Sequence, residues 1–317
     1  MPTGIGIASG IGFLQNKSGQ PSPNPPVPLT DATFQTAIND ILAQDVNGNF
    51  DLFPYGKIQD WDVSQVTTAT LAFNGRFNFN GDLSAWDVSS MTQMNGMFGF
   101  CTSFDPDLSS WDTSSAIRMN GMFNGCLVFN SDISSWDVSN VDDMAAMFSN
   151  CQAFDQDLSS WDVSNVDDFA TMFNGAILFD ADISGWDVSN GLEFHQMFFG
   201  ANSFNVDISG WDVSSANRLD SMFRGSSMTF NQDISSWDVG NANNMQSMFE
   251  KNPVFNQDIS GWDVSSATNM REMFEDATAF NQDLSGWAVN NVTNCVDFSD
   301  GASSWTLPKP NFTNCTP

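Results

Sequence analysis

The chain has 317 residues, of which 38 are acidic and 9 are basic, giving a net charge of -29. Nucleic-acid binding needs a basic footprint, so this charge argues against DNA or RNA as a partner. The charge also disfavours an anionic membrane surface, and no apolar run in the sequence is long enough for insertion into a membrane.

The first 29 residues differ in composition from the rest of the chain. Residues 1–16 are rich in glycine and isoleucine, and residues 17–29 are rich in proline, which favours an extended chain. No basic segment precedes the apolar residues, so the pattern is not typical of a secretion signal. We therefore predict a docking leader at 1–29. Its apolar contact residues are predicted to be Ile5, Ile7, Ile11, Phe13 and Leu14.

Residues 30–57 are predicted to form an N-terminal cap on the repeats that follow, as a capping helix and a turn. Thr30 and Asp31 are typical of a helix start, and apolar residues then recur at helical spacing as far as Leu42. We predict one amphipathic helix over 31–44, followed by a turn that contains glycine and proline. A stack of repeats needs its first apolar layer covered, and this helix would cover it.

A tryptophan returns every 25 residues over the range 58–305, with one interval of 26. A fixed period of this length indicates a stack of short coils, because one such unit cannot bury its own apolar face. The repeating tryptophans are Trp61, Trp86, Trp111, Trp136, Trp161, Trp186, Trp211, Trp237, Trp262 and Trp287.

We number the positions of each coil from its tryptophan as zero. In the coil of Trp161, the spacing aliphatic-x-x-Trp-x-Val predicts a short strand. Phe169, Met172 and Phe173, at plus 8, plus 11 and plus 12, predict one face of a short helix. The expected fold is an α/β repeat: a leucine-rich-repeat-like solenoid of about nine to ten coils, each with a short parallel strand and a short helix. Residues 306–317 are predicted to be a C-terminal tail.

The five cysteines fall into two groups. Cys101, Cys126 and Cys151 occupy the same position in successive coils and are predicted to be small buried side chains. An oxidised pair between neighbouring coils is the alternative. Cys295 and Cys315, near the end of the chain, are candidates for a covalent staple of the C-terminal cap.

Two segments carry a family resemblance. They are YGKIQDWDVSQVT at residues 55–67 and FNQDISGWDVSSATNMREMF at residues 255–274. Both resemble the BspA-like leucine-rich-repeat surface proteins, including the 25-residue repeats abundant in mycoplasmas. The resemblance spans roughly residues 31–298 and implies a leucine-rich-repeat-like solenoid with a role in surface interaction or adhesion. It implies no catalytic residues.

Two acidic positions recur along the repeats, at plus 1 and minus 4. The plus-1 aspartates alternate with inward-facing residues, so they point outward and form a candidate binding surface. The residues of this acidic row are Asp87, Asp112, Asp137, Asp162, Asp187, Asp212, Asp238 and Asp263. Strands stack about 4.8 Å apart, so the charges repel one another. Hydrogen bonds from serine at plus 3 and from backbone N–H groups, raised pKa values, or bound divalent cations such as calcium are the three ways to relieve this repulsion.

No catalytic centre or cofactor is expected. His195 is the only histidine; it has no matched serine or cysteine partner in the sequence and is expected to be a solvated residue. The chain lacks zinc-ligand spacing and a phosphate-binding glycine loop. Acidic pairs recur in every coil, which indicates architecture and not one catalytic pair.

These features predict a non-enzymatic structural or adhesion protein. We expect a virion surface component, such as a phage fibre, decoration or host-attachment protein, because an adhesion repeat without an export signal suits a particle assembled inside a host cell. Its leader would bind other virion or surface proteins, and its coils would bind a host receptor or glycan. An extracellular, cell-surface bacterial adhesin is the first alternative, and an acidic cation-binding matrix protein is the second. A homo-oligomer is compatible with each of them.

Overall fold

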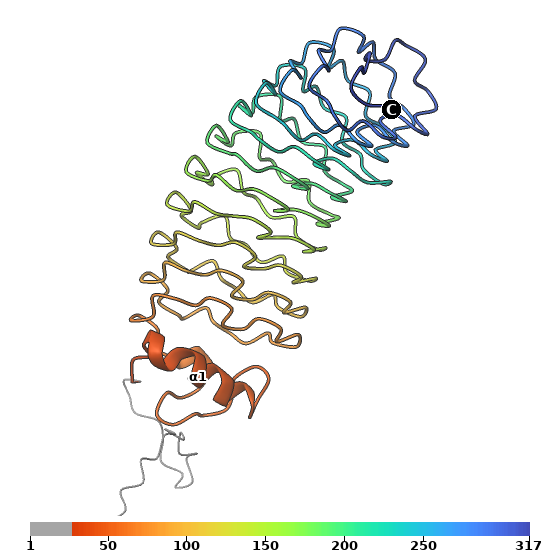
Figure 1. Ribbon diagram of the computed structural model, residues 1–317. Coiled ribbons are helices and arrows are strands. Elements are labelled where there is room, and N and C mark those ends of the chain that lie inside the picture. Colours follow the sequence, from red (N-terminus) through yellow and green to blue (C-terminus); the bar gives the residue numbers. More distant parts are fainter. Residues whose placement is uncertain (1–26) are drawn as a thin grey trace, which may run out of the picture.

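The computed structural model describes residues 27–317, which wind into an elongated stack of coils (Figure 1). The described chain contains the helix α1, Asp31–Leu42, and one 3-10 turn, η1, Ile58–Asp60. Within residues 27–317, no helix has the length and apolar character needed to cross a bilayer. The predicted contact residues of the leader lie outside the described range: Ile5, Ile7, Ile11, Phe13 and Leu14.

Helix α1 lies at the N-terminal end of the stack, against the first coil (Figure 1). At its start, the Thr33 hydroxyl accepts a hydrogen bond of 3.0 Å from the Thr30 N–H, in the manner of a capping box. The Asp31 carboxylate accepts hydrogen bonds from the N–H and the hydroxyl of Thr67, both at 2.7 Å, and so ties the helix to coil one. The buried face of the helix consists of Phe34, Ala37, Ile38 and Ile41. The helix predicted over 31–44 is therefore present and ends at Leu42.

Each coil is a series of tight turns. In the coil of Trp136, backbone bonds from residue i+3 to residue i close the turns Ile133–Trp136, Val138–Val141, Met144–Met147 and Phe148–Cys151, at N···O distances of 2.9–3.1 Å. The first and last residues of these turns are apolar and buried. Because several such turns follow one another, the chain changes direction often enough to close a loop in 25 residues.

One side of every coil is joined to the next coil by a parallel hydrogen-bond ladder. Met144 N–H donates to the Asp168 carbonyl at 3.0 Å, and Ala146 N–H donates to the Ala170 carbonyl at 2.8 Å. Isolated parallel bridges at plus 7 continue this pairing from Thr68 to Asn294. We call positions plus 6 to plus 14 the ladder face.

The predicted elements of the coil are wrong in two respects. The helix predicted at plus 8 to plus 12 is absent, because α1 and η1 are the only helices in residues 27–317. The predicted strand covers minus 3 to plus 2. Within residues 27–317, the bridges between successive coils lie at plus 7 instead. The i, i+3, i+4 spacing of the apolar residues instead reflects two successive turns. Along these turns, the backbone N–H groups donate alternately to carbonyls of the same coil and of the next coil.

Two left-handed residues in each coil explain why no helix forms. Positions plus 10 and plus 14 have positive φ in all ten coils, as at Ala146 (56°) and Asn150 (58°). A left-handed residue cannot continue a right-handed helix. It suits the third position of a type II turn, where glycine or asparagine is favoured. Position plus 14 is accordingly glycine in six coils, whereas plus 10 is glycine only at Gly96 and Gly121.

Thr171→Gly should raise the free energy of unfolding by about 0.5–1 kcal/mol. Thr171 is β-branched and has φ of 56°. Left-handed geometry costs an L-residue about 1–2 kcal/mol. Replacement by glycine removes this cost, but the greater flexibility of glycine in the unfolded chain costs about 0.5–1 kcal/mol. Thr268, whose φ is not positive and whose hydroxyl donates to the Asn243 carbonyl, provides the matched control. Urea denaturation should show that Thr268→Gly lowers stability, and a loss of stability in both variants would contradict the strain argument.

The interior is one continuous apolar column along the stack. Each repeat tryptophan after Trp61 donates its indole N–H to a carbonyl of the preceding coil, as Trp111 does to Leu83 at 3.0 Å. Two phenylalanines stack within each central coil, with the rings of Phe148 and Phe154 4.1 Å apart, and Phe148 also stacks on Phe173 of the next coil at 5.6 Å. The hydrophobic side chains and the tryptophan hydrogen bonds therefore link every coil to its neighbours.

The cysteines behave as their positions predict. Cys101, Cys126 and Cys151 are buried and unpaired, and each thiol lies 3.0–3.1 Å from a phenylalanine carbonyl of the preceding coil. Cys295 and Cys315 form a disulfide. This bond holds the chain's last residues, 306–317, against the final coil, where the Phe312 ring packs edge-on against Phe298 at 4.9 Å.

Candidate binding surface

The structure places the acidic row on the outside of the stack, one residue per coil. Each member is exposed: Asp87, Asp112, Asp137, Asp162, Asp187, Asp212, Asp238 and Asp263. Asp112 represents the local geometry, since its Oδ1 accepts bonds from the Ser114 N–H at 3.1 Å and from the Ser114 hydroxyl at 2.6 Å. The minus-4 aspartates make the same turn with the serine two residues later, as Asp107 does with Ser109. The predicted hydrogen bonds to serine and backbone are therefore confirmed.

The hydrogen bonds from serine make several of these carboxyl groups unusually acidic, and Asp112 is one of them. The side-chain and backbone hydrogen bonds from Ser114 lower the pKa of Asp112 below its ordinary value of 3.8. A lowered folded-state pKa means that the ionised carboxylate stabilises the fold above the unfolded-state pKa, and that this stabilisation is lost as pH falls through the folded-state pKa. In a carboxyl NMR titration, Ser114→Ala should raise the pKa of Asp112. The pKa of Asp162, which has its own partner Ser164, should stay low in that variant; an unchanged Asp112 would contradict this account.

The chemistry of the ladder face changes from coil to coil. At plus 9 it presents asparagine in early coils, then alanine, then His195 and Asp220. Five of the nine basic residues also lie on this face: Arg118, Arg218, Arg224, Lys251 and Arg271. The Arg218 guanidinium pairs with Asp220 at 2.9 Å, and His195 Nδ1 lies 3.2 Å from Glu193 Oε2. His195, predicted to be solvated, is therefore a partly buried member of a polar cluster.

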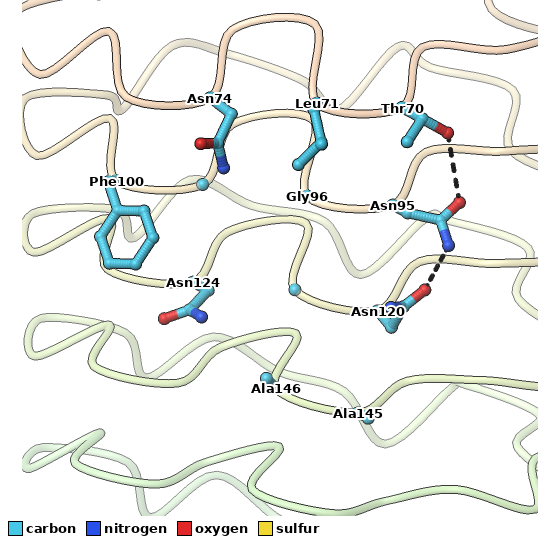
Figure 2. A pocket seen from close by; sticks show the side chains of 12 residues that line it. Thr70, Leu71, Asn74, Asn95, Gly96, Phe100, Asn120, Asn124, Ala145 and Ala146 are labelled. Carbon is cyan, nitrogen blue, oxygen red and sulfur yellow. Dashed lines mark hydrogen bonds between the residues drawn. The ribbon is translucent and has the colours of Figure 1, made fainter.

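A shallow groove of about 470 Å³ crosses the ladder face of the first four coils (Figure 2). One wall is a polar row, in which the Thr70 hydroxyl donates to Asn95 and the Asn95 amide donates to Asn120. Phe100 and Asn124 lie across the groove from this row (Figure 2).

Glycines shape the floor of the groove, which is most open at Gly121, where an added Cβ would meet no atom closer than 3.9 Å. The lining includes Gly96 and Gly121 at plus 10, and Gly99 at plus 13. The Leu71 and Asn74 side chains from the preceding coil lie over Gly96 and Gly99, where a Cβ atom would collide with them. Sequence reasoning missed this site, although the signal was present as glycine at plus 10 and plus 13 beside an aromatic residue at plus 14.

One group of three carboxylates in residues 27–317 is close enough to hold a cation. Oxygen atoms of Glu250, Glu272 and Glu275 lie within 4.8 Å of one another. Glu250 is buried and already pairs with Arg224 at 2.8 Å and Lys251 at 2.7 Å, so basic residues offset part of the charge. Burial, together with Glu250 and Glu272, raises the pKa of Glu275. The acidic-row residues form no comparable group within the described range.

The chain is a repeat protein of stacked coils, because its coils repeat, share one core and are joined by bridges at the same position. A family model described as "Mycoplasma protein of unknown function, DUF285" matches residues 44–160, 128–229 and 207–311. These overlapping matches cover well over half of the 317 residues, and the chain belongs to this family. None of the curated proteins compared with the chain matches it.

Proposed function

We propose that the chain is a leucine-rich-repeat-like solenoid of the BspA-like type that acts in adhesion and not in catalysis. The observation that carries this proposal is the contrast between its faces. The buried residues and the Asp–Ser turns recur from coil to coil, whereas the ladder face changes from neutral amides to charged clusters. In repeat proteins, a constant scaffold with a variable face is typical of an extended binding surface.

The proposed location is the surface of a virion, where the protein would serve as a fibre, decoration or host-attachment protein. Residues 1–29 would anchor it to other virion proteins, and the ladder face would meet a host receptor. The disulfide Cys295–Cys315 supports a role outside the reducing cytosol, since such bonds persist in oxidising surroundings. A cell-surface adhesin is the second candidate, and the match to a Mycoplasma family favours it.

Purified particles and surface-labelled producer cells distinguish the two locations. For a virion protein, mass spectrometry should find the full chain in particles, and a variant lacking residues 1–29 should be missing from them while keeping the thermal stability of its coils. For a cell-surface adhesin, the chain should be labelled on intact cells and absent from particles. Normal incorporation of the truncated chain would contradict anchoring through the leader, and absence from both fractions would contradict both locations.

A further inference from the structure

We infer that the groove across the first four coils, from Thr70 to Ala146, binds an uncharged carbohydrate. This inference rests on the proposed adhesion function and names the ligand class and its site. The groove combines an open aromatic ring, unpaired amide groups and a lining without charge. These are the groups that recognise the apolar faces and the hydroxyls of a sugar.

The two large apolar residues of the groove are in unfavourable positions for stability. Phe100 is 48% exposed with φ of 61°, and Leu71 is 55% exposed with φ of 56°. Left-handed geometry is costly for bulky residues, and exposure to water gains nothing for an apolar side chain. Every coil has left-handed residues at these two positions, so what sets Phe100 and Leu71 apart is a large apolar side chain exposed there, which a bound ligand would cover. The Phe100 ring lies over Gly125, where an added Cβ would come within 2.7 Å of its Cδ1, and it makes no ring contact with another described residue.

Amide groups provide the polar partners. The side chains of Asn74 and Asn124 make no hydrogen bond with any described residue, and the Asn120 amide N–H donors are also unpaired. Asn120 is held by the bond from Asn95, so it is already oriented before a ligand arrives (Figure 2). An amide both donates and accepts, as a sugar hydroxyl does, so several hydroxyls could be bound at once.

Charge decides between ligand classes. None of the residues that line the groove is charged, on a chain with 38 acidic residues and a net charge of -29. An anionic glycan would be repelled by the whole protein and would find no base in the groove, and a basic peptide would find no carboxylate there. The lining extends over four coils, or roughly 14 Å at about 4.8 Å per step. An uncharged oligosaccharide of a few rings fits this length.

The test uses the purified full-length protein and four uncharged trisaccharides, maltotriose, cellotriose, mannotriose and chitotriose, with sialyllactose as the acidic comparison. Saturation-transfer NMR should detect binding of at least one uncharged sugar, and titration calorimetry should give its Kd. Phe100→Gly should weaken that binding by about tenfold or more, equivalent to about 1.4 kcal/mol. The variant is expected to fold, because six coils already have glycine at this position.

A second variant tests the amides. Asn124→Ser introduces the residue found at the same position of the next coil, Ser149, and should also weaken binding. Asn150→Gly, at plus 14 but outside the groove, is the control and should leave the Kd unchanged.

Three results would overturn the inference: no uncharged sugar binds, only sialyllactose binds, or binding survives both Phe100→Gly and Asn124→Ser. Because the assay uses purified protein, its failure is separable from failure of the proposed function. If the protein is found in particles but binds no uncharged sugar, only the sugar site is overturned. Sugar binding by a protein absent from particles and cell surfaces would overturn only the proposed location.

Discussion

Trp136→Ala should lower the free energy of unfolding by about 3–5 kcal/mol, the usual loss when a buried aromatic residue is truncated. The Trp136 side chain is 3% exposed, its ring stacks on Trp111 at 6.0 Å, and its indole N–H donates to the Leu108 carbonyl at 3.0 Å. Truncation removes contacts with the preceding coil, and each coil of such a stack is stabilised by its neighbours. Urea denaturation followed by circular dichroism measures the effect.

Two further substitutions assign the loss to its causes. Trp136→Phe keeps an aromatic ring but leaves the Leu108 carbonyl without its indole partner, so it should lie between the wild type and Trp136→Ala. Leu127→Ala, in the coil of Trp111 at a side chain that is 38% exposed, should change stability by no more than about 0.5 kcal/mol. If Trp136→Ala were as mild as Leu127→Ala, the tryptophan row would not be the main support of the stack.

Cys315→Ser should destabilise the C-terminal end by about 3 kcal/mol, because the disulfide closes a loop of about that entropic value. The bond joins residues separated by 20 positions and holds Phe312 on Phe298. Hydrogen exchange should show that amides in the last coil lose protection while those of the central coils keep it, since distant coils share no contacts.

Reducing agent gives an independent check of the disulfide. Treatment of the wild-type protein should reproduce the hydrogen-exchange pattern of Cys315→Ser, and should have no further effect on that variant. Cys101→Ser retains the Cys295–Cys315 bond and should remain as sensitive to reductant as the wild type. An exchange pattern that reductant does not alter would mean that the bond contributes little to the cap.

The buried side of the coil was predictable because it depends on composition at a fixed period. Trp136, Met147 and Phe148 are buried as the 25-residue register indicates, and α1 begins at the predicted Asp31. The local path of the backbone was not predictable from apolar spacing alone. Turns with a left-handed residue at plus 10 place side chains on one side at nearly the same residue spacing as a helix does. Residue types such as Thr171 and Gln196 at that position do not indicate a positive φ.

The candidate site could be predicted only in part. The Asp–Ser turns follow from adjacent residues, so the outward position of Asp112 and its bond to Ser114 were accessible from the sequence. The groove is formed by residues that are 20 or more positions apart, such as Leu71 over Gly96 and Phe100 opposite Asn120. Whether such a side chain covers the neighbouring coil or leaves a gap depends on how the coils stack. The 25-residue spacing of the sequence does not specify this.

The parallel bridges at plus 7 also give the molecule a unit of length. Each bridge joins equivalent residues of consecutive coils, and the one 26-residue interval, bridged from Arg218 to Asn244, keeps the same pairing. Gain or loss of one whole repeat of the gene would therefore change the reach of the protein by one step of roughly 4.8 Å. A change in the central coils would leave α1, the groove and the disulfide-bonded cap intact, so reach and recognition can vary independently.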